Sequence, residues 1–295
     1  MTLIELITAQ SARLKQAGVC FGHGTTNAFD ESAWLVLWSL GLPLESLETR
    51  AQQTLSDAER AKAEALVSQR IESRRPAAYL THEAWLQNVP FFVDERVLIP
   101  RSYIAELLAD AEDEGTLDAW LSDETRQVLD LCTGSGCLAV IAAMAYPDIV
   151  VDAADLSPQA LEVARINVDK HKLAQRITLL ESDLLGVVRG SYDLIMCNPP
   201  YVNSASMQAL PAEYRAEPAL ALAGGTDGMD LVRFIIRDAG RHMTDNAVLL
   251  LEIGHERFNF ESAFPRLEVA WLETSGGHDQ VLLVTRDSLQ RWGQR

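Results

Sequence analysis

An apolar run at residues 192–197 stops abruptly at the tetrapeptide Asn198-Pro199-Pro200-Tyr201. Two consecutive prolines fix φ and remove two backbone donors, so a strand cannot continue through them. Asn198 is therefore expected at the C-terminal edge of a strand, where open α/β sheets bind their ligands. A side-chain amide next to an aromatic ring suits a planar group that bears an NH2. Taken alone, a Pro-Pro turn is more often structural than catalytic.

A glycine loop lies upstream, at residues 132–136 (Cys-Thr-Gly-Ser-Gly), between an apolar run at 128–131 and a helix-like run at 138–146. The glycines allow a sharp turn and a close approach to a ligand, and the helix N-terminus offers unpaired N–H groups. Counted through Ala139, the spacing is also that of a dinucleotide-binding loop. The loop by itself is compatible with NAD, FAD and S-adenosylmethionine.

Polar residues close the expected strands in sequence order. A strand at 149–154 ends at Asp155, about 20 residues beyond the glycine loop, where such folds place an acid that binds ribose hydroxyls. A strand at 177–180 is soon followed by Asp183, and the fourth ends at Asn198. Because these groups follow successive strands of one sheet, we expect them to lie along one edge and to form one ligand site.

These motifs resemble those of the protein-glutamine N5-methyltransferases, a family of class I S-adenosylmethionine-dependent methyltransferases. Three further segments carry the resemblance: Leu98–Ser102 (Leu-Ile-Pro-Arg-Ser), Leu210–Tyr214 (Leu-Pro-Ala-Glu-Tyr) and Glu217-Pro218. Within the family, other segments resemble the branch that modifies the third protein of the large ribosomal subunit rather than the branch that modifies release factors. These segments are Tyr79–Trp85, Val93–Arg96, Ser102–Ile104, Cys132–Cys137 and Trp271–Glu273.

The resemblance implies an α/β fold with a Rossmann-like seven-strand sheet whose last strand is antiparallel. The expected parts are a helical substrate-recognition domain at 1–75, a β-hairpin linker at 76–100 and the catalytic domain at 101–295. Helical periodicity through residue 75 and strand-like alternation at 79–100 agree with this division. The alternation places a turn at Asn88-Val89-Pro90. His23 is expected in an exposed connection, and residues 202–227 in a long loop.

By the same resemblance, Asn198, Pro199, Pro200 and Tyr201 carry out the chemistry. The Asn198 side-chain oxygen and the Pro199 carbonyl would accept both N–H bonds of a glutamine amide, and Tyr201 would wall or stack on it. No general base or metal is implied. Cofactor binding is implied for Asp130, Cys132, Thr133, Gly134, Ser135, Gly136, Asp155, Asp183, Leu184 and Asn198. Arg101 and Glu217 would organise the substrate loop, or form a structural ion pair.

The net charge and the cysteines restrict which partners the protein can bind and in which cellular compartment we expect it. The net charge of −17 is divided into −3 for residues 1–100 and −14 for the remainder, so the catalytic half should repel nucleic acid and attract a basic protein. A basic ribosomal protein is the expected partner, and no nucleic acid or membrane is expected. Between Arg101 and Arg126 eight acids and no basic residue suggest a solvated helix face. Four cysteines without metal-site spacing favour the cytoplasm.

Three other functions remain open from the residues. An adenine-N6 DNA methyltransferase could use the same NH2-binding tetrapeptide, but it would need a basic groove. An NAD-dependent oxidoreductase could share the glycine loop and Asp155, but it has no need of Asn198-Pro199-Pro200-Tyr201. A non-catalytic ribosome-assembly protein could keep a vestigial cofactor fold.

Overall fold

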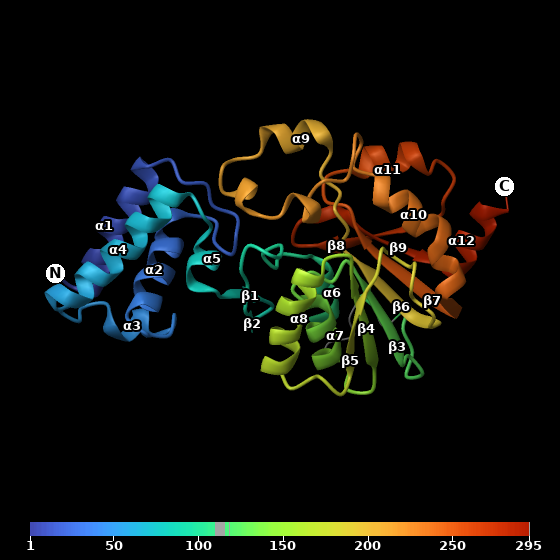
Figure 1. Cartoon of the computed structure of the whole chain (residues 1–295), viewed down its shortest axis with the longest axis horizontal. Coiled ribbons are helices and arrows are strands. Elements are labelled where there is room, and N and C mark those ends of the chain that lie inside the picture. The colour runs from blue at the N-terminus through green and yellow to red at the C-terminus, as the bar shows by residue number, and fades with distance from the viewer. Residues whose placement is uncertain (110–115, 118, 295) are drawn as a thin grey trace.

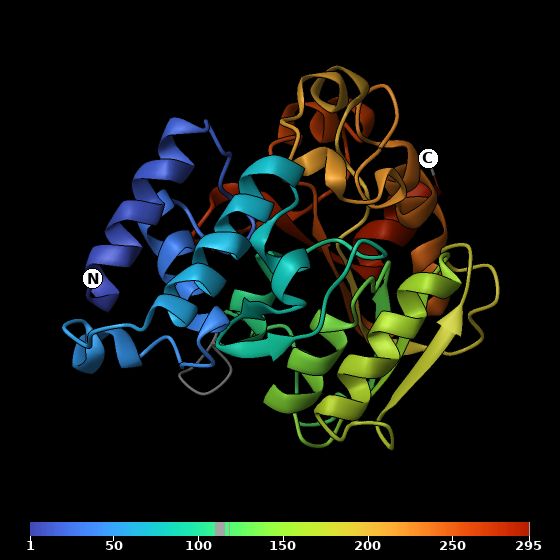
Figure 2. The ribbon, with the colours of Figure 1, turned by 60° about the vertical axis from the view of Figure 1, so that its left-hand side comes forward.

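A helical region and a sheet-containing region make up the chain in the computed structural model, which describes residues 1–109, 116–117 and 119–294. The N-terminal helices lie at one end of the molecule, and a fan-shaped sheet covered by helices forms the rest (Figure 1). A two-stranded hairpin lies between them. In a view turned by 60°, the N-terminal helices come forward and partly overlap the sheet-containing region (Figure 2).

The helical region contains four helices and a short fifth: α1 (Leu3–Gln16), α2 (Ala28–Ser39), α3 (Ser46–Arg50), α4 (Asp57–Ser73) and α5 (Ala77–Thr81). Capping boxes begin α1 and α4, because Thr2 with Glu5 and Ser56 with Glu59 satisfy each other's backbone N–H groups. α1, α2 and α4 enclose a small core. Its fully buried side chains include Leu3, Leu6, Ile7, Val36, Leu37 and Ala63.

The linker hairpin pairs β1 (Ala84–Leu86) with β2 (Val89–Phe91). Its turn is at Gln87 and Asn88, so the expected turn at 88–90 was placed one residue too late. Both residues have positive φ (48° and 59°), as a two-residue type I′ turn requires. Pro90 fits within β2 because a two-stranded hairpin leaves one side of each strand without a partner. Tyr79 lies in α5 rather than in a strand.

The seven-strand sheet has the order β5-β4-β3-β6-β7-β9-β8. Six strands run in the same direction, five of them (β3 to β7) paired in parallel, and β9, the last in the chain, runs antiparallel to both of its neighbours, β7 and β8. The resemblance predicted this arrangement, and it is confirmed. The strands are β3 (Gln127–Leu131), β4 (Val150–Asp155), β5 (Ile177–Glu181), β6 (Tyr192–Cys197), β7 (Met243–Glu252), β8 (Ala270–Thr274) and β9 (Gly277–Thr285).

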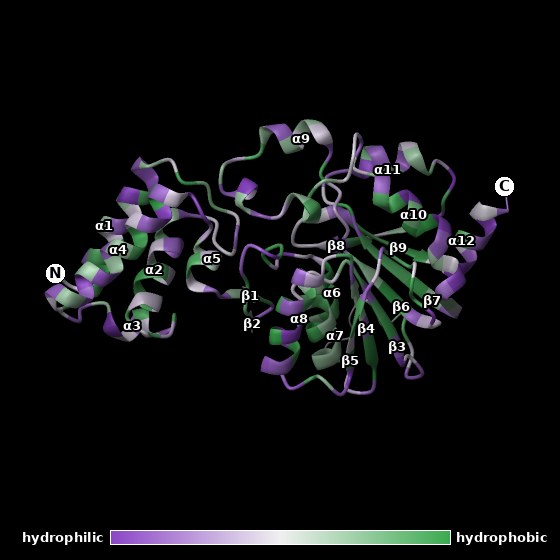
Figure 3. Ribbon diagram, viewed as in Figure 1, coloured by the Kyte–Doolittle hydropathy of each residue, from purple (hydrophilic) through white to green (hydrophobic). Residues whose placement is uncertain are grey.

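Helices cover both faces of the sheet, and the strands alternate their side chains between two apolar layers. Leu194 and Met196 of β6 face the layer of α6 (Ile104–Ala109), α7 (Cys137–Ala145) and α8 (Pro158–Lys170). Ile195 and Cys197 face the layer of α10 (Asp230–Asp238), α11 (Arg257–Ala263) and α12 (Arg286–Gly293). The strands are accordingly hydrophobic throughout, whereas the helices carry polar outer faces (Figure 3).

Several segments differ from the sequence-based expectation. The expected loop at 202–227 contains α9 (Ser204–Ala209) and the 3-10 turns η2 (Tyr214–Ala216) and η3 (Ala219–Ala221). The C-terminal helices α11 and α12 were not predicted. Five of the eight acids between Arg101 and Arg126 lie outside the described residues, so the expected helix face there is not described. None of the helices in the described residues is long and apolar enough to cross a membrane.

Candidate active site

The C-terminal ends of β3, β4, β5 and β6 open into one cleft, which together with its solvent-filled mouth has a volume of about 810 Å³. This is the edge at which the sequence predicted a ligand site. One side of the cleft is formed by the linker after the hairpin, and the other by the segment that follows the tetrapeptide. The cleft is lined, among others, by Val97, Leu98, Cys132, Gly134, Asp155, Leu156, Ser157, Ser182, Asp183, Leu184, Asn198, Pro200, Pro218, Leu220 and Ala221.

The glycine loop between β3 and α7 is held from beneath by Asp130. Its Oδ2 accepts hydrogen bonds from the Thr133 hydroxyl (2.5 Å) and from the Ala139 backbone N–H (3.1 Å). Burial raises the pKa of the Asp130 carboxyl to about 7, against the effect of these two bonds. Its Oδ1 is buried and has no hydrogen-bond partner among the described residues. Asp130 therefore shapes the loop rather than lining the cleft.

Asp155 connects the end of β4 to the glycine loop and also lines the cleft. Its Oδ2 accepts from the Gly134 backbone N–H at 2.8 Å, and its Oδ1 accepts from the Ser157 N–H at 2.9 Å. The space over Gly134 is open, because an added Cβ would have no neighbour closer than the Cys132 carbonyl at 4.0 Å. A ligand can therefore approach the backbone of this loop closely.

Asn198 faces the cleft at the end of β6, and its side-chain amide makes no hydrogen bond to any residue that the structure describes. Pro200 also lines the cleft, whereas Pro199 is buried and is not among the lining residues. The amide of Asn198 therefore has both its donor and its acceptor available to a ligand. A buried strand end with an uncommitted amide is typical of a recognition site rather than of a structural turn.

Tyr201 points away from the cleft and under the loop that follows it. Its hydroxyl lies 3.4 Å from Glu252 Oε1, at the end of β7. Its ring lies so close to Gly254 (φ +53°) that a Cβ there would stand 2.6 Å from Tyr201 Cε2. Tyr201 does not line the cleft, so the structure places its ring in a packing position behind the tetrapeptide rather than at the wall expected from the resemblance.

Glu252 is a buried acid that sequence reasoning missed. Its Oε2 accepts from the Ser102 hydroxyl (2.6 Å) and from the Tyr103 backbone N–H (2.9 Å), which connects β7 to the Ile-Pro-Arg-Ser segment. Burial raises the pKa of this carboxyl to about 7, although its hydrogen bonds oppose the shift. A signal was present, because β7 is a further apolar strand that ends in a polar residue.

Arg101 and Glu217 form an ion pair with each other. Two parallel hydrogen bonds of 2.6 and 2.8 Å join the guanidinium to the carboxylate, which also lies 3.3 Å from His23 Nε2. Burial alone would raise the pKa of Glu217, but His23 and Arg101 lower it to about 2. The expectation of an exposed His23 is wrong: its side chain is 1% exposed, packed against Tyr214 with ring centroids 4.2 Å apart.

Of the residues proposed from the sequence, the structure brings a subset together around the cleft: Cys132, Gly134, Asp155, Asp183, Leu184, Asn198 and Pro200. The others lie behind it. Thr133 and Ser135 are buried within the glycine loop, and Gly136 (φ +78°) begins α7. Ser157 and Ser182 line the cleft and were not proposed; each follows a strand end by one or two residues.

Comparison with known proteins agrees with this geometry. The family model of the methyltransferase small domain matches residues 110–214, and that of the PrmC N-terminal domain matches residues 5–81. Among solved structures, the catalytic domain of hMettl16 in complex with the MAT2A 3′UTR hairpin 6 superposes with a TM-score of 0.51. The superposition covers 77% of this chain and 81% of that chain at 15% identity, so it reports on the fold alone.

Fold and cleft together define a class I methyltransferase, an enzyme that uses S-adenosylmethionine. The ribosomal protein uL3 glutamine methyltransferase of Bordetella pertussis is 51% identical over 98% of this chain and 96% of its own. Those of Neisseria meningitidis serogroup B and Burkholderia pseudomallei are each 48% identical over 98% of this chain and 94% and 95% of theirs. The chain belongs to the family of ribosomal protein uL3 glutamine methyltransferases.

The residues of the cleft fit S-adenosylmethionine. The open backbone at Gly134 can meet its methionine portion, and the carboxylate of Asp155 stands where ribose hydroxyls need an acceptor. Leu156 and Leu184 offer apolar walls to an adenine ring. The cleft also extends past Asn198 to Pro218 and Leu220, which leaves room for a second reactant.

Proposed function

We propose that this enzyme methylates the side-chain amide nitrogen of a glutamine in the ribosomal protein uL3. The observation that carries the proposal is the uncommitted amide of Asn198 at the mouth of a methyltransferase cleft, in a chain whose family members are named for this substrate. S-adenosylmethionine supplies an electrophilic methyl group to this cleft.

The chain's own contribution is to orient a poor nucleophile. The nitrogen of an amide has its lone pair delocalised into the carbonyl, so it must be held in a geometry that weakens this delocalisation. The Asn198 Oδ1 at the cleft accepts one N–H bond of the glutamine, and the backbone carbonyl of Pro199, whose ring is buried behind the cleft lining, accepts the other; this directs the lone pair toward the methyl group. The nitrogen becomes strongly acidic as it is methylated, so no dedicated base is needed.

Residues that do not contact the glutamine hold the two acceptors, the Asn198 Oδ1 and the Pro199 carbonyl, in place. Two prolines restrict the backbone that carries the Pro199 carbonyl. Tyr201, clamped between Gly254 and Glu252, prevents the tetrapeptide from rotating. We assign the protein-substrate recognition to residues 1–75 and to the cleft wall at 218–221, because the helical region contacts the segment that leads to this wall, through Arg70 and Glu213, and neither part forms the cofactor loop.

The partner we propose is basic, as ribosomal proteins are as a class. The charge of −17, concentrated in residues 101–295, favours such a partner and disfavours DNA or RNA as a substrate. A release-factor substrate would use the same chemistry, but the relatives described above carry the name of the ribosomal protein. Because ribosomes are assembled there, we place the enzyme in the cytoplasm.

The test is a methyl-transfer assay with labelled S-adenosylmethionine and three purified acceptors: uL3, a release factor and adenine-containing duplex DNA. Labelled uL3 is then digested and sequenced by mass spectrometry. We expect a single added methyl group on a glutamine of uL3, and labelling about 100-fold slower with the Asn198→Ala variant. Preferential labelling of the release factor or the DNA would contradict the proposal.

A further inference from the structure

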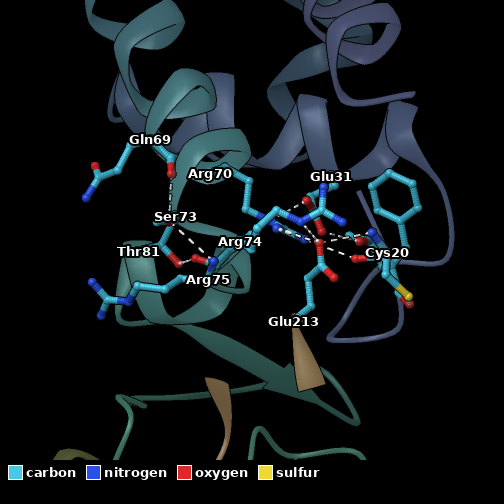
Figure 4. A network of polar contacts seen from close by, with 12 residues as sticks. Cys20, Glu31, Gln69, Arg70, Ser73, Arg74, Arg75, Thr81 and Glu213 are labelled. Carbon is cyan, nitrogen blue, oxygen red and sulfur yellow. Dashed lines mark hydrogen bonds and ion pairs between the residues drawn. The ribbon is translucent and has the colours of Figure 1, made fainter. Parts of the chain in front are cut away.

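A buried charge cluster, which the chemistry described above does not use, joins the helical region to the catalytic domain. It contains Arg70 and Arg74 at the end of α4, Glu31 of α2, and Glu213, which comes from the segment after the tetrapeptide (Figure 4). Arg70, Glu31 and Glu213 have side chains no more than 1% exposed. Two cations and two anions make the cluster neutral overall.

Arg70 uses each nitrogen of its guanidinium for a different partner. Its Nε donates to Glu31 (2.9 Å), one terminal nitrogen donates to Glu213 (3.5 Å), and the other donates to the Cys20 carbonyl (3.0 Å). Only a planar guanidinium can serve three fixed acceptors in this way. Arg70 therefore ties α2, the connection after α1 and the segment containing Glu213 to one point.

Glu213 receives three donors on one oxygen. Its Oε1 lies 2.8 Å from Arg74 Nε and 3.5 Å from the Arg70 guanidinium, and it accepts from the Cys20 backbone N–H at 3.2 Å. A carboxylate that is fully buried must be compensated in this way, because removal from water strongly disfavours its charge. The position of Glu213 is thus determined by the helical region.

The turn η2 lies between Glu213 and Glu217, and both of its ends are fixed. At its far end Glu217 is held by Arg101 and His23. Within the turn, the Tyr214 ring packs on His23. The Tyr214 hydroxyl oxygen also lies so close to Gly22 that a Cβ added to this glycine would be 2.2 Å from it. Directly after Glu217 comes the segment 218–221, of which Pro218, Leu220 and Ala221 line the cleft.

We propose that Arg70, acting through Glu213, is a positioning residue for methyl transfer: the helical region holds the cleft wall at 218–221 in the reactive geometry. The inference rests on the chain acting as the methyltransferase proposed above. It adds that residues 1–75 contribute to turnover as well as to the recognition of the partner. Arg70 touches neither reactant, so its effect is transmitted through Glu213 and η2.

Glu213→Gln is the decisive variant, because it keeps the size of the side chain and an acceptor for the Cys20 N–H but removes the charge that Arg70 and Arg74 hold. We expect its kcat on uL3 to fall about tenfold, with the affinity for S-adenosylmethionine unchanged and KM for uL3 altered much less than kcat. Hydrogen exchange should accelerate at residues 204–222. The matched control is Glu64→Gln, which breaks the exposed pair with Arg60 on α4 and should change none of these quantities.

A purely structural role predicts a different pattern. Loss of folded protein would lower the number of cofactor sites and leave kcat per site unchanged, so turnover is divided by the sites counted in a cofactor titration. Arg74→Met, at a 32% exposed side chain, gives a second test if Glu213→Gln folds poorly. Normal kcat per site in both variants would overturn the proposal. Absence of uL3 labelling by the unaltered enzyme would instead refute the proposed function.

Discussion

The proposed role of Asn198 can be tested directly by a single substitution. Its side chain lines the cleft and makes no hydrogen bond within the described residues, so its removal costs the fold little. We predict that Asn198→Ala binds S-adenosylmethionine with nearly normal affinity and lowers kcat by about 100-fold, because an acceptor aimed at the reacting amide is lost. Calorimetry and the methyl-transfer assay measure the two quantities.

The control for this variant is Asn246→Ala, at an exposed asparagine of β7. It should retain full activity. Substantial turnover by Asn198→Ala would show that the amide is oriented by another group.

Glu252 makes the stability of the enzyme depend on pH. Burial raises the pKa of this carboxyl from 4.5 to about 7, so between these values the folded protein holds a proton that the unfolded chain has released. The unfolding free energy therefore decreases as the pH rises through this window, by about 3 kcal/mol from Glu252 alone. We predict that Glu252→Gln shows a smaller decrease between pH 5 and 8 in denaturant titrations.

Asp130, whose carboxyl is shifted in the same direction, is left in place in that variant, so part of the pH dependence should persist. An unchanged slope in Glu252→Gln would mean that Glu252 titrates normally in the folded state.

The sequence predicted site residues correctly where a polar residue directly follows the end of a strand. Asp155, Asp183 and Asn198 were expected at strand ends and do meet at one cleft. His23 could not be placed, because its burial depends on Glu217, which lies 194 residues later. Glu213 was noticed only within the expected loop and the segment that carries the family resemblance, since nothing local indicates that Arg70 and Arg74 will surround it.

At the scale of elements, the side chain of one asparagine connects the helix α8, the linker after the hairpin and the glycine loop. Asn167 of α8 is fully buried; it accepts from the Phe92 N–H (2.7 Å) and donates to the Phe92 carbonyl (3.0 Å) and the Ser135 carbonyl (2.8 Å). The linker hairpin and the glycine loop are therefore both attached to α8. Few side chains other than a neutral amide can satisfy one donor and two acceptors at once.

We predict that Asn167→Ala lowers the unfolding free energy by roughly 3 kcal/mol, since it leaves buried backbone groups of Phe92 and Ser135 unpaired. The affinity for S-adenosylmethionine should fall as well, because the glycine loop loses a support. Denaturant titration and calorimetry check both effects. Arg165→Ala, on the exposed face of the same helix, is the control, and equal behaviour of the two variants would contradict the prediction.

Among the elements, those with clear periodicity were predicted well. The parallel strands β3 to β6 and the helix α7 agree with the sequence-based ranges to within two residues. α5 was mistaken for a strand because its five residues are too few to display a helical period. α11 and α12 are short and were missed, since they are fixed by packing of Phe260 and Leu289 onto the sheet rather than by local propensity.

At the scale of the whole molecule, the charge of −17 should act on association. A strongly acidic enzyme attracts a basic protein over distances that salt screens. We predict that kcat/KM for uL3 falls several-fold when the salt concentration is raised from about 0.05 to about 0.3 M, while kcat at saturation changes little. Steady-state kinetics at several salt concentrations measure this effect. A kcat/KM that does not depend on salt would show that long-range electrostatic attraction does not speed the association with uL3.

The buried cluster around Arg70 has a consequence for the newly synthesised chain. Glu31 precedes Arg70 by 39 residues, whereas Glu213 follows it by 143. At about 5–20 residues per second, the ribosome takes roughly 7–30 s to make the second partner after the first pair is complete. During this interval Glu31 alone balances Arg70, so the helical region can fold without leaving that guanidinium unpaired. We expect Arg74 to stay hydrated until Glu213 emerges and the two halves of the enzyme join.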